Sequence, residues 1–327
     1  MALDKNFRIE YIILFIILFY VIIITMFQAF KNIFKIKPTK FLGIDIGTSF
    51  IRVVEIERHN REYRLANYGE LGESSFKKQP FRTSEKNALL LSNKNIAKAI
   101  SAILEEAEIQ TKNVNFSIPD FYSFFTSFEL PAMDKKEISG AIRYQVRPFV
   151  PLPLDEIDLD WSIIEGRPSE TPLKVLVVAI PKETVVQYQE IADLVGLKLR
   201  FLESEAFALA RSSAEDKGEE AKKIIGLIDI GAWSTTCSIL EQGILKNSYS
   251  FNIAGNELTK AIDRSLNIKY NEAEDLKKRY GLLPSTAAPE NFVKGTQNEN
   301  LSGNIFPKIL IPLIDSIIGR SEERRVG

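Results

Sequence analysis

The chain has 327 residues, with 42 Lys and Arg against 43 Asp and Glu, one His and one Cys. A formal net charge of −1 excludes a protein that binds nucleic acid through bulk positive charge, so we expect no nucleic-acid partner. One Cys and one His exclude a disulfide scaffold, a cysteine-based zinc site and a His-rich metal site. What remains is a globular α/β or α+β protein of a reducing compartment, in which carboxylates and backbone amides would have to hold any cofactor.

An uncharged apolar segment lies near the start of the chain. Residues 11–27 (YIILFIILFYVIIITMF) carry no charge, and up to residue 30 they give about 20 residues, enough for a helix across ~30 Å of hydrocarbon. The alternatives are a buried core helix, which normally shows a polar stripe that this segment lacks, and a cleaved signal peptide. Residues 31–40 contain four Lys and no acid, and basic flanks stay in the cytoplasm. We therefore expect residues 1–36 to be a single-pass transmembrane anchor in the inner (cytoplasmic) membrane, with the rest facing the cytoplasm.

Strands dominate the stretch after this segment. The pattern predicts an antiparallel meander of three strands, at residues 40–46, 50–58 and 62–69. Residues 71–93 show no steady period and are expected to form an exposed loop. Apolar residues at helical spacing then predict a helix at residues 93–107, and a short strand follows at 114–118.

A compact α+β unit is predicted inside the longer chain, at about residues 124–203. Asp134 and Glu137 have the spacing of a capping box, which opens a helix that Pro148 stops. A Pro-rich turn (VPLPLDE) follows at residues 150–156. The other elements expected in this unit are strands at 123–130, 159–165, 174–180 and 198–203, and a helix between Pro181 and Gly196.

The opening pattern returns after a charged linker at residues 212–223. It again predicts three strands, at residues 224–230, 235–241 and 244–251. Helices are expected at residues 255–266, 271–280 and 306–318, with a polar loop at 283–303.

One motif occurs twice, in FLGIDIGTSFIRVVEIE at residues 41–57 and in IIGLIDIGAWSTTCSILEQG at residues 224–243. Each copy is an apolar strand, Asp-Ile-Gly, a turn of small residues and a second strand. The Gly allows a tight turn in which backbone N–H groups approach phosphate oxygens. The Asp at the strand end, Asp45 or Asp229, repels phosphate and is useful only with a divalent cation between them, bound through water. The two copies therefore predict a clamp for Mg²⁺ and a polyphosphate.

The paired loops resemble the phosphate-1 and phosphate-2 loops of the actin-like ATPase superfamily. This resemblance implies a two-lobed, ribonuclease H-like α/β fold that binds ATP with Mg²⁺. Arg52 lies where actin-like proteins place a Lys that reaches the phosphates. Glu203 begins the segment ESEAFALAR and lies where an acidic or amide residue orients the attacking water. The residues that the resemblance assigns to the nucleotide are Asp45, Gly47, Thr48, Ser49, Arg52, Asp229, Gly231, Ser234, Thr235, Gly255, Asn256, Glu274 and Lys277.

Several of these residues also have a purely structural explanation. Glu274 completes a capping box if Asn271 is the N-cap of its helix, and Lys277 lies on a charged face where a solvated lysine is equally expected. Glu203 ends an apolar strand, where a carboxylate tends to be buried, and Thr235 is alternatively an ordinary strand residue.

Within this superfamily the sequence resembles the PilM family of type IV pilus assembly. The segments that carry the resemblance are GIDIGTSFIRVVEIE at 43–57, AIRYQVRPFVPLPLDEIDLDW at 141–161, ESEAFALAR at 203–211, GNELTKAI and AEDLKKRYG. They imply a first actin-like lobe at residues 37–222, with the inserted unit inside it, and a second lobe at 223–327. The second lobe is expected to be incomplete, because the family continues with a strand and a Gly-Gly turn, whereas residues 319–327 are polar. An anchor within the chain also departs from the family pattern.

The resemblance implies an ATP-binding scaffold in the inner-membrane platform of a type IV pilus or a related secretion machine, at most a slow ATPase. It further implies that the cytoplasmic tail of a PilN-like membrane protein docks at Phe149 and Leu152. Other pilus assembly components are expected partners, and a homo-oligomer is left open. The alternatives are a filament-forming cell-division protein of the FtsA type, whose membrane helix is C-terminal and amphipathic, and a sugar-kinase-like enzyme, which needs a catalytic Asp in a deep cleft.

Overall fold

The computed structural model describes residues 39–59, 62–73, 81, 91–213, 224–282 and 305–323. The expected anchor, the charged linker from residue 214 and the polar loop at 283–303 lie outside the described residues. Within the ranges given above, the structure contains no helix with the length and apolar character needed to span a membrane. Residues 41–56 and the described residues from Leu65 onward belong to one compact unit.

The first copy of the repeated motif forms part of a five-stranded sheet. Its strands are ordered β3-β2-β1-β4-β8 and comprise β1 (Thr39–Ile46), β2 (Phe50–His59), β3 (Glu62–Gly72), β4 (Asn113–Ile118) and β8 (Lys198–Ser204). The first three strands are neighbours in chain order, as a meander requires, whereas β4 runs parallel to both β1 and β8. Alternate residues of β1, Leu42, Ile44 and Ile46, are buried in the core beneath the sheet.

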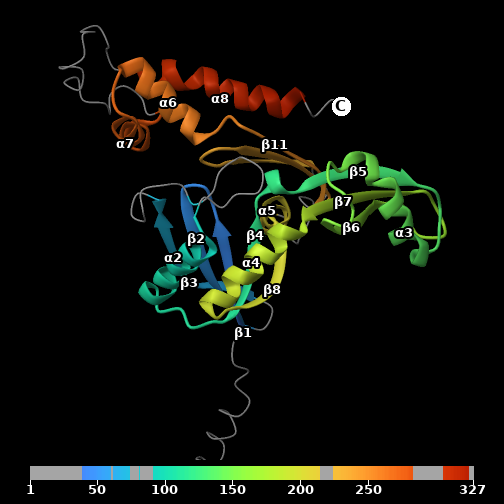
Figure 1. Ribbon diagram of the computed structural model, residues 1–327. Coiled ribbons are helices and arrows are strands. Elements are labelled where there is room, and N and C mark those ends of the chain that lie inside the picture. Colours follow the sequence, from blue (N-terminus) through green and yellow to red (C-terminus); the bar gives the residue numbers. More distant parts are fainter. Residues whose placement is uncertain are drawn as a thin grey trace, which may run out of the picture. The chain divides into compact units, whose positions relative to one another are not determined.

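Helices α2 (Asn93–Glu106) and α4 (Lys182–Val195) share this core with the sheet (Figure 1). Tyr188 of α4 packs edge-on against Phe116 of β4, with ring centroids 5.5 Å apart. Helix α4 ends as expected, because Gly196 takes the left-handed C-cap conformation at φ +74°. Since α4 and β8 belong to this layer, the inserted unit does not reach residue 203, and that part of the expectation is wrong. Crossover strands return to their parent sheet, a relation that order along the chain does not reveal.

The inserted unit is a three-stranded antiparallel sheet with one helix. Its strands are ordered β5-β7-β6 and comprise β5 (Phe124–Leu130), β6 (Ile157–Glu165) and β7 (Leu173–Pro181). Helix α3 (Lys135–Gln145) begins with the predicted capping box of Asp134 and Glu137, and a short turn η3 (Arg147–Phe149) follows it. Ile138 and Ile142 of α3 pack with residues of all three strands in a separate core.

The second copy of the motif opens another three-stranded antiparallel sheet, ordered β11-β10-β9. Its strands are β9 (Ile224–Ile230), β10 (Thr235–Glu241) and β11 (Ile244–Phe251). Helices α6 (Gly255–Leu266), α7 (Tyr270–Tyr280) and α8 (Ile305–Glu323) share one hydrophobic core. The N-cap of α7 is Lys269, so the capping box between Asn271 and Glu274 is wrong, because Asn271 already lies inside the helix.

The expected exposed loop at residues 71–93 contains buried anchors. Strand β3 extends to Gly72, and Phe81 and Leu91 are 0% and 3% exposed. The backbone N–H of Phe81 donates to the carbonyl of Thr48 at 2.9 Å, and that of Glu73 donates to the carbonyl of Ser49 at 2.9 Å. A single buried aromatic residue produces no periodic pattern, which is why the sequence did not reveal this contact. The loop therefore supports the turn that follows β1.

Candidate functional site

Both glycines of the repeated motif lie where a side chain has no room. A Cβ added to Gly47 would lie 2.7 Å from the carbonyl oxygen of Phe50, three residues later. A Cβ added to Gly231 would lie 2.9 Å from the carbonyl oxygen of Ser234, also three residues later, and the Gly231 N–H donates to that oxygen at 2.9 Å. The two turns thus have the same close backbone approach, and each requires a residue without a Cβ at this position.

Three polar residues form a row across the parallel part of the five-stranded sheet. Asp45 of β1 pairs in register with Ser117 of β4, and Ser117 pairs in register with Glu203 of β8. Each is the last residue but one of its strand, near the carboxyl end where α/β sheets bind ligands. With strands about 4.8 Å apart, the backbones of Asp45 and Glu203 are separated by roughly 10 Å, with Ser117 between them.

Ser117 is a site residue that the sequence analysis missed. Its hydroxyl donates a hydrogen bond of 2.9 Å to Asp45 Oδ1 and thereby orients that carboxylate. The available signal was its penultimate place in a predicted strand, the place that Asp45 also occupies. Nothing local to Ser117 identifies it, because its role depends on the neighbouring strand.

Arg52 is held by the acids around it. Its Nη1 lies 3.9 Å from Asp45 Oδ2, and its Nε donates to Glu70 Oε2 at 3.3 Å. The guanidinium also lies over the Phe50 ring, 5.0 Å from the ring centroid. The structure therefore places Arg52 beside the first turn and pairs it with carboxylates. An anion at the turn would compete with Asp45 and Glu70 for this cation.

Glu203 lies at the junction of β8 with helix α5 (Glu205–Ser213). The buried Asp120 fixes this junction, because its Oδ1 accepts hydrogen bonds from the Ser204 hydroxyl and, at 3.1 Å, from the Ala206 N–H. Arg211 of α5 donates to Glu203 Oε1. This hydrogen bond raises the pKa of Arg211, which therefore stays positively charged.

Lys277 and Glu274 lie in a network between α6 and α7. Lys277 Nζ donates to the Gly255 carbonyl at 3.0 Å and to the Thr259 hydroxyl at 2.7 Å, and it forms an ion pair of 2.7 Å with Glu274. Burial opposes ionisation of Glu274, but hydrogen bonds from Lys277 and Thr259 outweigh it and lower the Glu274 pKa below its ordinary value of 4.5. Lys277 thus joins this pair of helices, with a side chain that is 19% exposed.

Three other expected contacts of the nucleotide are engaged within the protein. The N–H groups of Gly255 and Asn256 donate to the carbonyls of Gly231 and Ala232, at 3.0 and 2.8 Å. The Thr235 hydroxyl is buried and donates to the Ile253 carbonyl at 2.6 Å. These hydrogen bonds hold the second turn against the start of α6.

Trp233 lies inside the second turn, with Lys260 Nζ 5.6 Å from its ring centroid. The indole is 36% exposed, so it is open to solvent and to a ligand at this turn. The chain has two Trp residues, and the other, Trp161, lies in β6 of the inserted unit.

The carboxylate of Glu73 lies near this network, and its pKa is shifted in the direction opposite to that of Glu274. Burial, reinforced by repulsion from Glu274, raises the pKa of Glu73 above its ordinary value of 4.5, although a hydrogen bond with Ser49 opposes the shift. Glu73 Oε2 is buried without a hydrogen-bond partner among the described residues. Glu73 is thus joined to the first turn by its hydrogen bond with Ser49 and is repelled by the carboxylate that Lys277 holds.

Asp45 and Asp229, the two aspartates of the repeated motif, are the carboxylates of these turns that could bind a metal ion. Asp45 is oriented by Ser117, whereas Asp229 is exposed and pairs in register with Thr236. Over the described part of the chain, no three His, Cys, Asp or Glu residues form a group that could hold a metal ion directly. Carboxylates are ligands that a hydrated divalent cation accepts, and each of these two follows a buried or paired strand and precedes a tight glycine turn.

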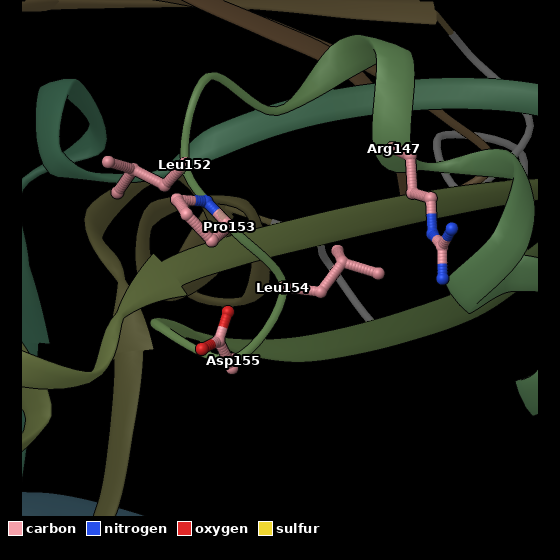
Figure 2. A pocket seen from close by; sticks show the side chains of 5 residues that line it. All are labelled: Arg147, Leu152, Pro153, Leu154 and Asp155. Carbon is pink, nitrogen blue, oxygen red and sulfur yellow. The ribbon is translucent and has the colours of Figure 1, made fainter.

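A further pocket lies in the inserted unit, around the Pro-rich turn. It has a volume of about 380 Å³ and is lined by Arg147, Leu152, Pro153, Leu154 and Asp155. Figure 2 shows Arg147 reaching from η3 toward Leu154, with Asp155 farther along the same turn. Of the two expected partner contacts, Leu152 lines this pocket, while Phe149 is half-exposed and stacks on Phe128 at 5.9 Å. The turn itself is fixed by Lys182, whose Nζ donates to the Asp155 carbonyl at 2.7 Å.

Comparison with solved structures identifies the fold of this chain. The chain matches a structure titled PilM-PilN type IV pilus biogenesis complex with a TM-score of 0.67 and 23% identity, over 87% of this chain and 75% of that one. It matches the ethanolamine utilization protein EutJ of Carboxydothermus hydrogenoformans with a TM-score of 0.51 and 13% identity, over 88% and 72%. Together with the duplicated turns, these likenesses show an actin-like ATPase fold.

The family follows from the sequence match. The model of the type IV pilus assembly protein PilM matches residues 43–291, and the chain belongs to this family. Curated relatives are cell division proteins FtsA, one from Enterococcus faecalis (22% identical, 88% of this chain, 70% of the relative) and one from Streptococcus pneumoniae (24%, 77% and 58%). The chain therefore spans well under the full length of both relatives.

Proposed function

We propose that this protein is an ATP-binding actin-like scaffold of a type IV pilus platform, which docks the cytoplasmic tail of a PilN-like membrane protein. The observation that carries the nucleotide part is the pair of matching glycine turns, each following a strand that ends in Asp-Ile-Gly. Backbone N–H groups in such turns bind phosphate oxygens without a side chain in the way. Asp45 and Asp229 would hold Mg²⁺ through water, and the ion would neutralise phosphate charge.

Side chains and backbone groups around the two turns position the residues of this site. Ser117 orients Asp45, and the loop at Glu73 and Phe81 braces the first turn. The start of α6 braces the second turn through two backbone hydrogen bonds. Arg52 would leave Asp45 for a phosphate, which would free Asp45 to face the hydrated cation. Glu203, in the same row as Asp45, would orient a water toward the terminal phosphate.

Calorimetry of Mg²⁺-ATP binding to the purified 327-residue chain tests the nucleotide part. We expect D45A and D229A each to weaken binding by more than about tenfold, because each removes a carboxylate that holds the cation. The matched control is D158A, an exposed Asp of β6 in the inserted unit, which should bind like the wild type. A W161F variant leaves Trp233 in the second turn as the single indole, whose fluorescence reports binding directly. Equal affinity in wild type, D45A and D229A would contradict the phosphate clamp.

The docking part rests on the pocket of the inserted unit. Its leucines suit apolar side chains of an extended peptide, and Arg147 and Asp155 offer one charge of each sign to that peptide. The PilM-PilN complex is known for a protein with the same fold, which supports a PilN-like tail as the occupant here. A photoreactive residue at Phe149 should crosslink to that tail, and L152D should abolish the crosslink. L194D, at an exposed Leu of α4, is the control that should crosslink normally. Labelling of lipid or of the chain itself, with the tail present, would remove this site.

The apolar segment at residues 11–30 is proposed as a membrane anchor on sequence pattern alone. Protease added to spheroplasts should leave the folded part intact, because it would face the cytoplasm. Degradation of the folded part would contradict the orientation, and release of the intact protein by carbonate would contradict the anchor.

An FtsA-like filament former is a second candidate, because the curated relatives are FtsA proteins. ATP-dependent sedimentation separates the two proposals. A scaffold that docks a tail should stay in the supernatant with Mg²⁺-ATP, whereas a filament former should pellet.

A further inference from the structure

Glu203 makes a strong contact with a residue of the helix that follows it. Arg211 Nη2 donates to Glu203 Oε1 and forms an ion pair with it. The Glu203 side chain is 23% exposed, whereas that of Arg211 is 67% exposed, in the last turn of α5. The contact thus joins a largely enclosed carboxylate of the candidate site to a cation at its surface.

The ion pair with Arg211 interferes with the role proposed for Glu203, which is to orient the attacking water. A carboxylate that orients an attacking water must offer an oxygen to that water and accept its proton. A guanidinium stays charged in proteins and gives short, strong hydrogen bonds to carboxylates. While Arg211 is bound, one oxygen of Glu203 is engaged by the guanidinium and is not available to orient a water.

The two partners are held very differently. Glu203 is fixed by the pairing of β8 with β4, and the junction after it is fixed by Asp120. Arg211 has a long, exposed side chain at a helix end, so it can swing away without a change in the fold. The contact can therefore open and close while the row of Asp45, Ser117 and Glu203 stays in place.

We propose that Arg211 is a positioning residue that restrains Glu203, so that bound ATP is hydrolysed slowly until Arg211 is drawn away. This inference rests on the proposed function as an ATP-binding protein. In the hydrolysis step that Arg211 slows, the water oxygen bonds to the γ-phosphorus of ATP. The bond from that phosphorus to the β,γ-bridging oxygen breaks. ADP leaves with the electron pair of that bond, and the water's proton passes to Glu203.

Steady-state ATP hydrolysis by the full chain, with ATP affinity measured in parallel, tests this role. We expect R211Q to raise kcat by about tenfold and to leave the Kd for ATP unchanged, because Arg211 acts through Glu203 and not on the nucleotide. R211K, which retains a cation at this place, should restore the slow rate. R200Q removes an exposed Arg of β8 and should turn over like the wild type. The double variant E203Q/R211Q should return to the low rate of E203Q.

The outcomes separate the two claims. Normal ATP binding by R211Q with no rise in kcat would overturn the restraint, and so would a double variant as fast as R211Q. A lower kcat in R211Q would make Arg211 an aid to Glu203 and would also overturn it. Failure of the wild type to bind ATP would overturn the proposed function, and the restraint with it.

Discussion

Gly47 and Gly231 show how a single atom decides the shape of the candidate site. Alanine at Gly47 would bring its Cβ to 2.7 Å from the Phe50 carbonyl oxygen, a separation that requires the backbone to shift. We expect G47A to destabilise the protein by about 1–3 kcal/mol and to weaken ATP binding, as overpacking does at close contacts. Thermal unfolding and calorimetry measure the two effects.

Gly140 supplies the control for this prediction. It lies inside α3, and an added Cβ would have no atom within 4 Å. Because alanine suits a helix better than glycine, G140A should stabilise the chain by about 0.5–1 kcal/mol. Equal responses of G47A and G140A would show that the close approach at Gly47 is unimportant.

Glu73 should give the stability of the protein a distinct dependence on pH. Its pKa is raised above 4.5 in the folded state by burial and by repulsion from Glu274, so its ionisation costs stability as the pH rises through the folded pKa. E73Q should therefore raise the unfolding free energy at pH 7. This gain should shrink as the pH falls and vanish below pH 4.5, where Glu73 is protonated in both states. Denaturant unfolding across this range measures it.

The pKa of Glu274 is shifted in the opposite direction to that of Glu73, so its effect on stability should have the opposite pH dependence. Its pKa is lowered by Lys277 and Thr259, so its contribution to stability is present above 4.5 and is lost as the pH falls through the folded pKa. E274Q should therefore be less stable than the wild type at pH 7, and the difference should shrink below pH 4.5. A gain in stability from E274Q at pH 7 would contradict the network around Lys277.

At the scale of the element, α3 depends on its capping box. The Asp134 N–H donates to Glu137 Oε2 at 3.2 Å, and Ser169 donates to Asp134 Oδ1 at 2.7 Å. We expect D134A to cost about 1 kcal/mol, the usual effect of losing an N-cap. The control D275A removes an exposed Asp inside α7 and should change stability by less than about 0.5 kcal/mol. Chemical denaturation of both variants decides the prediction, and equal losses would contradict it.

The elements also show where sequence reasoning succeeds and where it stops. The start of α3 and the end of α4 were predicted, because a capping box and a C-cap glycine are local signals. The sheet to which β8 belongs was not predicted, because its pairing with β4 joins residues about 85 positions apart, as in Ser117 with Glu203. Ser117 was missed for the same reason.

At the scale of the whole molecule, nucleotide should stabilise the folded chain. A ligand that binds only the folded state at about 100 times its Kd adds about 2.7 kcal/mol. We expect Mg²⁺-ATP to raise Tm accordingly, ATP with a chelator to raise it much less, and D45A to show almost no rise. Differential scanning calorimetry measures these shifts. An equal rise with and without Mg²⁺ would contradict the role of Asp45 and Asp229 toward the cation.

The duplicated Asp-Ile-Gly turns, most of the helices and strands, and the family can be predicted from the sequence, because they depend on local spacing and turn chemistry. Which charged groups meet follows from the tertiary structure alone. It placed Ser117 between Asp45 and Glu203, Arg211 on Glu203 and Lys277 on Gly255, Thr259 and Glu274. The physical reason is that a side chain's partner is set by strand order and helix packing. A carboxylate has the same sequence signature whether a water, a cation or a guanidinium lies beside it.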